Sequence, residues 1–229
     1  MSEKAISSAV EDYLKAIYAL GGEVKTQDLA DALAVSPASV SGMLRKLSEL
    51  KLVEHERYRG VRLTDTGTKM ALETIRHHRL IETYLARALG FSWDEVHDEA
   101  ERLEHHISEA FEAKIARALG DPTHDPHGDP IPQLDGTMPT SDARPLTDFA
   151  ADTRVSITRI TQQRPEVLQY LAERRLTPGR EVRVVAQEPF DGPVTLACGD
   201  ARIVIANALA QTIYAERIME GSSPPRRHP

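Results

Sequence analysis

The sequence predicts a mostly α-helical chain that ends in a small β domain. Residues 1–74 contain three short helical patterns followed by a hairpin-like stretch, and residues 75–140 continue with longer helical patterns. Residues 151–220 instead contain short β-rich runs separated by Pro-Gly, Asp-Gly and Gly-Asp turns. We therefore expect a winged helix-turn-helix, a helical domain and an SH3-like β-barrel, in that order. Residues 141–150 are polar and contain proline, which predicts a linker, and residues 221–229 are expected to be disordered.

The composition is that of an ordinary globular protein. The 229 residues suit two or three small domains, with 41% apolar and 28% charged residues. No signal-peptide pattern is visible, and no apolar run approaches the roughly 20 residues of a membrane helix. The single cysteine, Cys198, lies in a strand-like segment, which favours a buried structural role over a nucleophile. We expect a cytoplasmic protein whose formal charge of −7 argues against wholesale coating of nucleic acid but allows a local basic surface.

Capping residues predict where the first three helices begin. Ser8 and Glu11 have the spacing of a capping box, and Thr26 is expected to cap the second helix. Ser36-Pro37 places a capping residue before a first-turn proline, which predicts the start of the third helix. The segments VEHE and VRLT are expected to pair across RYRG as a β-wing. The third helix is expected to bury Val40, Met43, Leu44, Leu47 and Leu50.

This helix-turn-helix with a basic wing predicts DNA binding. The second helix of such a unit enters the major groove, where small residues near its start allow close approach and basic residues contact phosphates. Because few of these side chains can make bidentate base contacts, recognition is expected to depend on backbone contacts and DNA shape. The alternative is a protein–protein module. The predicted DNA-contacting residues are Ser36, Pro37, Ala38, Ser39, Ser41, Gly42, Arg45, Lys46, Arg57, Tyr58 and Arg59.

The segment VHDEAERLEHH, residues 96–106, concentrates carboxylates and histidines. A helix turns about 100° per residue, so four of these side chains fall on one face beside an apolar one. Upstream, His78 and Glu82 lie one helical turn apart on another amphipathic helix, and metal sites in helical domains are built from facing helices. The sequence therefore predicts a metal site, with a merely solvated acidic face as the alternative. The four residues are His97, Glu101, Glu104 and His105.

No catalytic pattern accounts for these side chains. The HExxH, GxSxG, P-loop and GxGxxG motifs are absent, so we do not expect an enzyme. His124 and His127 lie in a Pro- and Gly-rich run and are expected to be exposed loop residues.

Taken in order, these segments resemble the diphtheria-toxin-repressor family of metal-dependent transcriptional regulators. The resemblance runs from about residue 5 to residue 218 and is closest to the manganese-responsive members. The specific motif is VHDEA followed by the E-x-x-E-H spacing. The resemblance implies a homodimer with a winged-helix DNA head, a helical metal and dimerisation domain, and a third, SH3-like domain. It is carried by Ser36-Pro37 through Gly67, RHHRLIETYL, VHDEAERLEHH and HGDPIP.

The resemblance also implies a primary metal site at Asp12, Glu101, Glu104 and His105. The iron-responsive branch has a methionine at the position of Asp12 and a cysteine at that of Glu101, and the carboxylates found here suit Mn²⁺ better than sulfur would. Lys15 stands where the manganese branch has a second carboxylate, which argues against a close two-metal cluster.

A second, ancillary site of the family matches His78, Glu82 and His97. The glutamate and glutamine that complete it in three-domain members match Arg164 and Val167 here, so this cap is not preserved as such.

The function that follows is a Mn²⁺-dependent regulator of double-stranded operator DNA that represses metal-uptake genes. Fe²⁺ is the alternative cofactor, and Zn²⁺ or Co²⁺ is expected to bind in vitro. A metal tying Asp12 to the helical domain would set the separation of two recognition helices near one DNA turn, roughly 34 Å. The alternatives are an iron-dependent regulator, a winged-helix regulator of a non-metal ligand, and a metal buffer or metalloenzyme that carries a helix-turn-helix.

Overall fold

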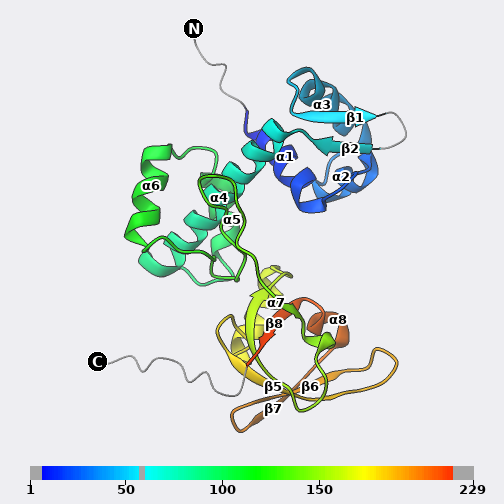
Figure 1. The fold of residues 1–229 in the computed structure, drawn as a ribbon, viewed down its shortest axis with the longest axis vertical. Coiled ribbons are helices and arrows are strands. Elements are labelled where there is room, and N and C mark those ends of the chain that lie inside the picture. Colours follow the sequence, from blue (N-terminus) through cyan, green and yellow to red (C-terminus); the bar gives the residue numbers. More distant parts are fainter. Residues whose placement is uncertain (1–6, 57–59, 219–229) are drawn as a thin grey trace. The chain divides into compact units, whose positions relative to one another are not determined.

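The computed structural model describes residues 7–56 and 60–218 (Figure 1). The chain forms two compact units. The first comprises the chain up to Ile81 with Glu99–Thr123 and Ile131–Pro139, and the second comprises Glu82–Asp98, His124–Pro130 and the chain from Thr140 onward. The mostly α-helical fold with a C-terminal β domain is confirmed.

The first unit begins with a winged helix-turn-helix. Its helices are α1 (Ser8–Leu20), α2 (Thr26–Ala32) and α3 (Pro37–Glu49), and its wing strands are β1 (Val53–Glu56) and β2 (Gly60–Leu63). The wing strands pair antiparallel, and backbone hydrogen bonds between Val24 and Val61, both 2.9 Å long, tie the wing to the segment between α1 and α2. Leu14, Leu29 and Leu44 are fully buried between the helices. The predicted wing turn at residues 57–59 lies outside the described residues.

The ends of these three helices agree only in part with the predicted ones. Ser36 caps α3 as expected, since its hydroxyl accepts a hydrogen bond of 3.1 Å from the Ser39 N–H. Ser8 is wrong as a cap because it lies inside α1, after Ser7, and Thr26 likewise lies inside α2, after Lys25. Leu50 is wrong as a core residue: α3 ends at Glu49, and Leu50 in the following turn is half exposed.

The helical part of the first unit follows the wing. It contains most of α4 (Asp65–Ala88), the end of α5 (Val96–Leu103) and α6 (Glu109–Ala118). Helix α6 is capped by the Ser108 hydroxyl, which accepts from the Phe111 N–H. The boundary expected at residue 74 falls inside α4, and the segment 75–140 is divided between the two units.

The second unit is built on a six-stranded antiparallel sheet in the order β3-β8-β4-β5-β6-β7. The pairing register shifts within β4, between Ile157 and Arg159, and within β5, between Val184 and Ala186. Apolar side chains on its inner face pack against α7, and Leu168 and Leu171 of α7 are fully buried. The elements are β3 (Arg144–Pro145), η1 (Leu146–Asp148), β4 (Arg154–Ile160), α7 (Pro165–Glu173), β5 (Glu181–Gln187), β6 (Val194–Cys198), β7 (Ala201–Ile205), α8 (Asn207–Ala210) and β8 (Ile213–Arg217).

The segment 141–150 is not the linker that its polar composition predicts. Arg144 and Pro145 pair with β8, while Leu146 and Phe149 are buried in the core of the β domain. Leu146 and Phe149 are therefore part of the domain that the segment was expected to precede. The tail, residues 221–229, lies outside the described residues.

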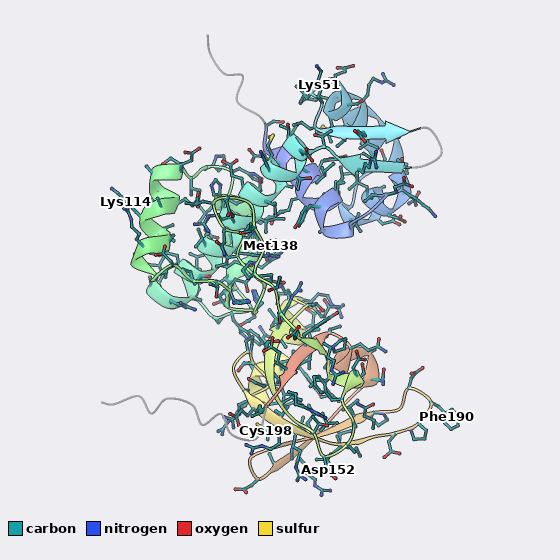
Figure 2. The ribbon with its side chains drawn as sticks, in the orientation of Figure 1. Lys51, Lys114, Met138, Asp152, Phe190 and Cys198 are labelled. Atoms are coloured by element: carbon teal, nitrogen blue, oxygen red, sulfur yellow. The ribbon has the colours of Figure 1, made fainter. Side chains whose placement is uncertain are left out.

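Two further expectations concern Cys198 and membrane insertion. Cys198 is buried in β6 as expected, with the Arg180 Nε–H 3.1 Å from its sulfur (Figure 2). Among the helices that the structure describes, none has the length and apolar content required to cross a membrane.

Candidate metal centre and DNA-binding surface

Helix α5 and the turn after it carry the acidic side chains of the predicted primary site. Val96 and Ala100 are fully buried and hold one face of the helix against the protein. This packing turns Glu104 inward, and its side chain is only 1% exposed. Glu101, one turn earlier, remains partly exposed. A carboxylate this deeply buried is costly unless cations or hydrogen-bond donors compensate it.

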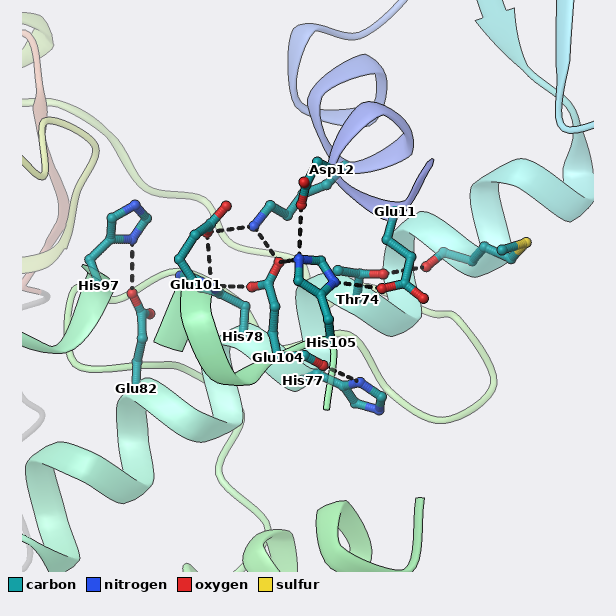
Figure 3. A network of polar contacts seen from close by, with 12 residues as sticks. Glu11, Asp12, Thr74, His77, His78, Glu82, His97, Glu101, Glu104 and His105 are labelled. Atoms are coloured by element: carbon teal, nitrogen blue, oxygen red, sulfur yellow. Dashed lines mark hydrogen bonds and ion pairs between the residues drawn. The ribbon is translucent and has the colours of Figure 1, made fainter. Parts of the chain in front are cut away.

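Helix α1 supplies two carboxylates to the same place, as Figure 3 shows. His105 Nε2 lies 2.9 Å from Asp12 Oδ1, and His105 Nδ1 lies 2.5 Å from Glu11 Oε2. Both ring nitrogens of His105 therefore face carboxylates of the helix-turn-helix domain. Asp12, Glu104 and His105 each offer one ligand atom within 4.8 Å of the others. We call this group, with Glu101, the α1–α5 cluster.

Two nitrogen-bearing side chains, Lys15 and His78, enter the α1–α5 cluster. Lys15 Nζ lies 2.6 Å from both Glu101 Oε2 and Glu104 Oε1. His78 of α4 forms a short hydrogen bond with Glu104, and its Nδ1 lies 3.4 Å from Glu101 Oε2. His78 was expected in the ancillary site, and these contacts place it beside the primary ligands.

The charges of the cluster shift its pKa values in opposite directions. Burial raises the pKa of Asp12, and the charges of His105 and Lys15 offset this only in part. Burial alone would raise the pKa of Glu104, but His78 and Lys15 outweigh it and lower that pKa. Burial alone would lower the pKa of Lys15, but Glu104 and Glu101 raise it. The negative charge of the carboxylates in this cluster is thus partly compensated by the ammonium group of Lys15.

A supporting network lies behind Glu104, and no sequence pattern indicates it. His77 of α4 places Nδ1 3.3 Å from the Glu104 carbonyl oxygen and Nε2 3.2 Å from Glu112 Oε2. Arg76 binds the same carboxylate of Glu112 and donates a 2.7 Å hydrogen bond to the Pro132 carbonyl. These contacts connect the backbone of the turn after α5 to α6.

A second group of ligand-type side chains lies in the second unit. Glu82 Oε1 is 3.2 Å from His97 Nδ1, which brings together two of the three predicted ancillary residues. Glu82, Asp125 and His127 are all buried and offer ligand atoms within 4.8 Å of one another. We call these three residues the Glu82 cluster.

The buried position of His127 corrects the expectation of an exposed loop residue. His127 is fully buried, whereas His124 is exposed as expected. The Nε2–H of His127 donates a 2.7 Å hydrogen bond to the Trp93 carbonyl, and Nδ1 of His127 lies 3.7 Å from Glu82 Oε2. Burial alone would lower the pKa of His127, but Glu82 and Asp125 raise it.

The loop around His127 is held by the β domain, which explains the burial. The Ile160 N–H donates to the His127 carbonyl, and Asp129 pairs with Arg159 and accepts from Gln163. Gly128 has φ +87°, and a Cβ there would lie 1.8 Å from the Thr158 carbonyl oxygen. Only glycine fits this approach.

The predicted DNA-contacting face is exposed on α3. Most of the described members lie in the first two turns of the helix, and the Ser41 hydroxyl donates a 2.9 Å hydrogen bond to the Pro37 carbonyl. Arg57, Tyr58 and Arg59 lie outside the described residues. The exposed residues are Ser36, Pro37, Ala38, Ser39, Ser41, Gly42, Arg45 and Lys46.

Both clusters suit a divalent ion. Each combines carboxylate oxygens with imidazole nitrogen, and neither contains a thiolate or thioether among its described members. Such donors favour harder divalent ions over soft ones.

Comparison with known proteins agrees with this arrangement. The family described as "Iron dependent repressor, N-terminal DNA binding domain" matches residues 5–61, "Iron dependent repressor, metal binding and dimerisation domain" matches residues 64–133, and "FeoA domain" matches residues 144–217. The chain is 30% identical over 228 residues to the diphtheria toxin repressor of Corynebacterium diphtheriae, which covers 94% of this chain and 100% of that protein.

Two manganese-related proteins are also similar. The HTH-type transcriptional regulator MntR of Bacillus pumilus is 38% identical over 103 residues, which cover 44% of this chain and 71% of that one. A solved structure described as a manganese-dependent transcriptional repressor in complex with manganese has a TM-score of 0.84 and 39% identity, covering 91% of this chain and 100% of that one. The chain belongs to the diphtheria toxin repressor family of metal-dependent, DNA-binding transcriptional repressors.

Proposed function

We propose that this chain is a manganese-responsive repressor that acts as a homodimer on double-stranded operator DNA in the cytoplasm, with no enzymatic activity. The observation that carries the proposal is the 2.9 Å approach of Asp12 Oδ1 to His105 Nε2. Asp12 belongs to the first helix of the DNA-binding domain, and His105 follows α5 of the helical part. Ligand-type side chains thus meet where the DNA-binding domain adjoins the rest of its unit.

The candidate ligands of the α1–α5 cluster come from two elements, α5 with the turn after it and α1. Glu101, Glu104 and His105 form a scaffold fixed by the burial of α5, and Asp12 joins it from α1. A divalent ion held by these side chains supplies positive charge that offsets the clustered carboxylates. Without that charge the carboxylates repel one another: after burial, the charges of Glu101 and Glu104 contribute to the raised pKa of Asp12. Metal binding favours the DNA-competent population to the extent that the ligands are better arranged there.

The choice of Mn²⁺ is supported by the donors. Carboxylates and imidazoles suit Mn²⁺, which stands at the low end of the divalent affinity series and is selected by geometry and donor hardness. Fe²⁺ accepts the same donors, and the similarity to iron-dependent repressors keeps it as the second candidate. Glu82, His97, Asp125 and His127 are proposed to serve ancillary metal binding. His78, which contacts Glu104, is proposed to support the primary site.

Homodimer formation is supported by the helical part of the first unit. Leu103, Phe111 and Leu134 are large apolar side chains that stand exposed there, with Leu134 81% exposed. These exposed side chains are available to a partner, and the match of residues 64–133 to a metal binding and dimerisation domain supports the homodimer. A repressor that binds DNA only with metal silences its target genes when the metal is plentiful, and we propose that these targets are metal-uptake genes.

DNA-binding titrations test the proposal. Fluorescence anisotropy of a promoter duplex is measured against Mn²⁺, Fe²⁺, Zn²⁺ and EDTA, with wild-type protein and with Asp12→Ala. We expect Mn²⁺ to promote binding and EDTA to reverse it, and the variant to lose the response. DNA binding that ignores both Mn²⁺ and EDTA would point to a non-metal ligand instead.

The donor argument has its own test. Asp12→Met combined with Glu101→Cys replaces two oxygen ligands with sulfur, so calorimetry is expected to show relative affinity moving from Mn²⁺ toward Fe²⁺. Unchanged relative affinities would contradict the argument from ligand hardness.

A further inference from the structure

Lys15 occupies a position among the candidate ligands. Its Nζ lies 2.6 Å from an oxygen of Glu101 and 2.6 Å from an oxygen of Glu104, so it bridges two carboxylates that belong to α5 and the turn after it. The lysine side chain is 20% exposed and the Glu104 side chain is fully buried. An ammonium has three donors and no acceptor, and two of its donors are used here.

The ammonium of Lys15 lies where a metal ion that bridges Glu101 and Glu104 would lie. Two divalent ions that share carboxylates in protein sites stand roughly 3.5–4 Å apart. Glu104 contacts Lys15 and His78, and it also contacts His105, which lies beside Asp12. One ion can use Asp12, Glu104 and His105, but a second ion beside it would need the oxygens that the ammonium holds.

We propose that Lys15 sets both the stoichiometry and the affinity of the α1–α5 cluster. Its ammonium acts as a built-in monovalent cation that limits the cluster to one divalent ion and competes with that ion for Glu104. This inference rests on the proposed function, because it assumes that the cluster binds metal. In the competing account, Lys15 only holds α1 against α5. Removing its charge would then weaken Mn²⁺ binding, whereas our proposal predicts that Mn²⁺ binds more tightly.

The test compares two substitutions of Lys15, one that removes its charge and one that reverses it. Lys15→Met keeps the length of the side chain and removes the charge, so we expect Mn²⁺ to bind the cluster at least ~10-fold more tightly. Methionine frees the two carboxylate oxygens but supplies no oxygen ligand for a second ion, so the number of ions per chain is expected to stay the same. Lys15→Glu adds a carboxylate, and we expect one additional Mn²⁺ per chain. Because neighbouring Mn²⁺ ions couple magnetically, the electron paramagnetic resonance spectrum of this variant is expected to broaden.

Control variants show whether a change in Mn²⁺ binding comes from the position of Lys15 or only from the changed net charge of the protein. Lys114 is an exposed residue of α6, so Lys114→Met and Lys114→Glu repeat both charge changes away from the cluster. We expect both controls to match wild type in affinity and stoichiometry. Circular dichroism melting confirms folding of each variant, and Lys15→Gln replaces Lys15→Met if the latter does not fold.

The possible outcomes are distinguishable. Unchanged or weaker Mn²⁺ binding by Lys15→Met, or no additional ion in Lys15→Glu, overturns the inference while the proposed function stands. Loss of Mn²⁺ binding is measured separately with Asp12→Ala. If that variant binds as many ions as wild type with equal affinity, the cluster is not a metal site, and the proposed function fails together with the inference.

Discussion

Glu11 Oε2 lies 2.5 Å from Nδ1 of His105, and the other nitrogen of the same ring faces Asp12. This contact fixes which nitrogen is available to a ligand. With Nδ1–H donated to Glu11, Nε2 is the nitrogen left to bind a metal, and it faces Asp12. A carboxylate behind a metal-binding histidine orients the ring and raises its basicity.

The first prediction concerns this contact. Glu11→Gln is expected to weaken Mn²⁺ binding by about 10- to 100-fold, the usual cost of losing such a partner. Isothermal titration calorimetry measures the change, and Glu23→Gln, an exposed residue beyond the end of α1, is the control. Equal affinities in the two variants would show that His105 needs no support from Glu11.

The second prediction separates metal binding from stability. Glu104 is fully buried and accepts from Lys15 and His78, whereas Glu101 is 43% exposed. Glu104→Gln is expected to lower the free energy of unfolding of the metal-free protein by about 1–3 kcal/mol, since it weakens hydrogen bonds to charged groups. Glu101→Gln is expected to change it by less than about 1 kcal/mol.

Both of these glutamine variants are expected to lose metal-stimulated DNA binding. Urea denaturation gives the stability and fluorescence anisotropy gives the DNA response. A Glu104→Gln protein as stable as wild type, or one that still responds fully to Mn²⁺, would contradict the role assigned to this buried carboxylate.

The sequence predicted elements whose signals are local. Ser36-Pro37 predicted the start of α3 because a capping hydroxyl and a first-turn proline act within one turn. The wing strands followed from alternation about a short turn. The spacing of Glu101, Glu104 and His105 predicted that they lie together, but the helix face invoked for this is wrong in part. Helix α5 ends at Leu103, so Glu104 and His105 lie in the turn that follows, and His97 contacts Glu82 instead. The meeting with Asp12 came from family resemblance.

Other features depend on packing between segments distant in the chain. Glu11 looked like a capping residue, but its carboxylate is used by His105, 94 positions later. His127 looked like an exposed loop residue because its neighbours are Pro, Gly and Asp, yet the β domain covers it through Ile160. The polar composition of residues 141–150 concealed two core side chains, Leu146 and Phe149. Composition cannot show which face of a loop another domain will cover.

The third prediction uses the raised pKa of His127, which stands above its ordinary value of 6.5. The folded metal-free protein therefore holds this proton more tightly than the unfolded chain. The resulting stability is fully present below about pH 6.5 and is lost as pH rises through the raised pKa. Mn²⁺ must displace the same proton, so its stabilising effect is expected to grow over that window.

Melting temperatures with and without Mn²⁺ at pH 6 and pH 8 test this linkage. The increase in melting temperature caused by Mn²⁺ is expected to be larger at pH 8. His127→Gln is expected to remove the His127 contribution to this difference, and His124→Gln, at an exposed position of the same loop, is expected to retain it. If His127→Gln shows the full wild-type difference, His127 is not the group that links pH to metal binding.

The fourth prediction concerns the exposed basic residues of α3. Arg45 and Lys46 are exposed on the predicted DNA-contacting face, where their charges can replace the counterions of phosphates. Arg45→Ala and Lys46→Ala are each expected to weaken DNA binding similarly on different sequences and to reduce the slope of log affinity against log salt by about 1. Anisotropy titrations at several salt concentrations and saturating Mn²⁺ measure the slope, with Lys114→Ala on α6 as the control. A salt slope unchanged from wild type in both variants would mean that this face of α3 does not contact phosphates. A loss of affinity for only one DNA sequence would mean that the substituted residue contacts base edges instead.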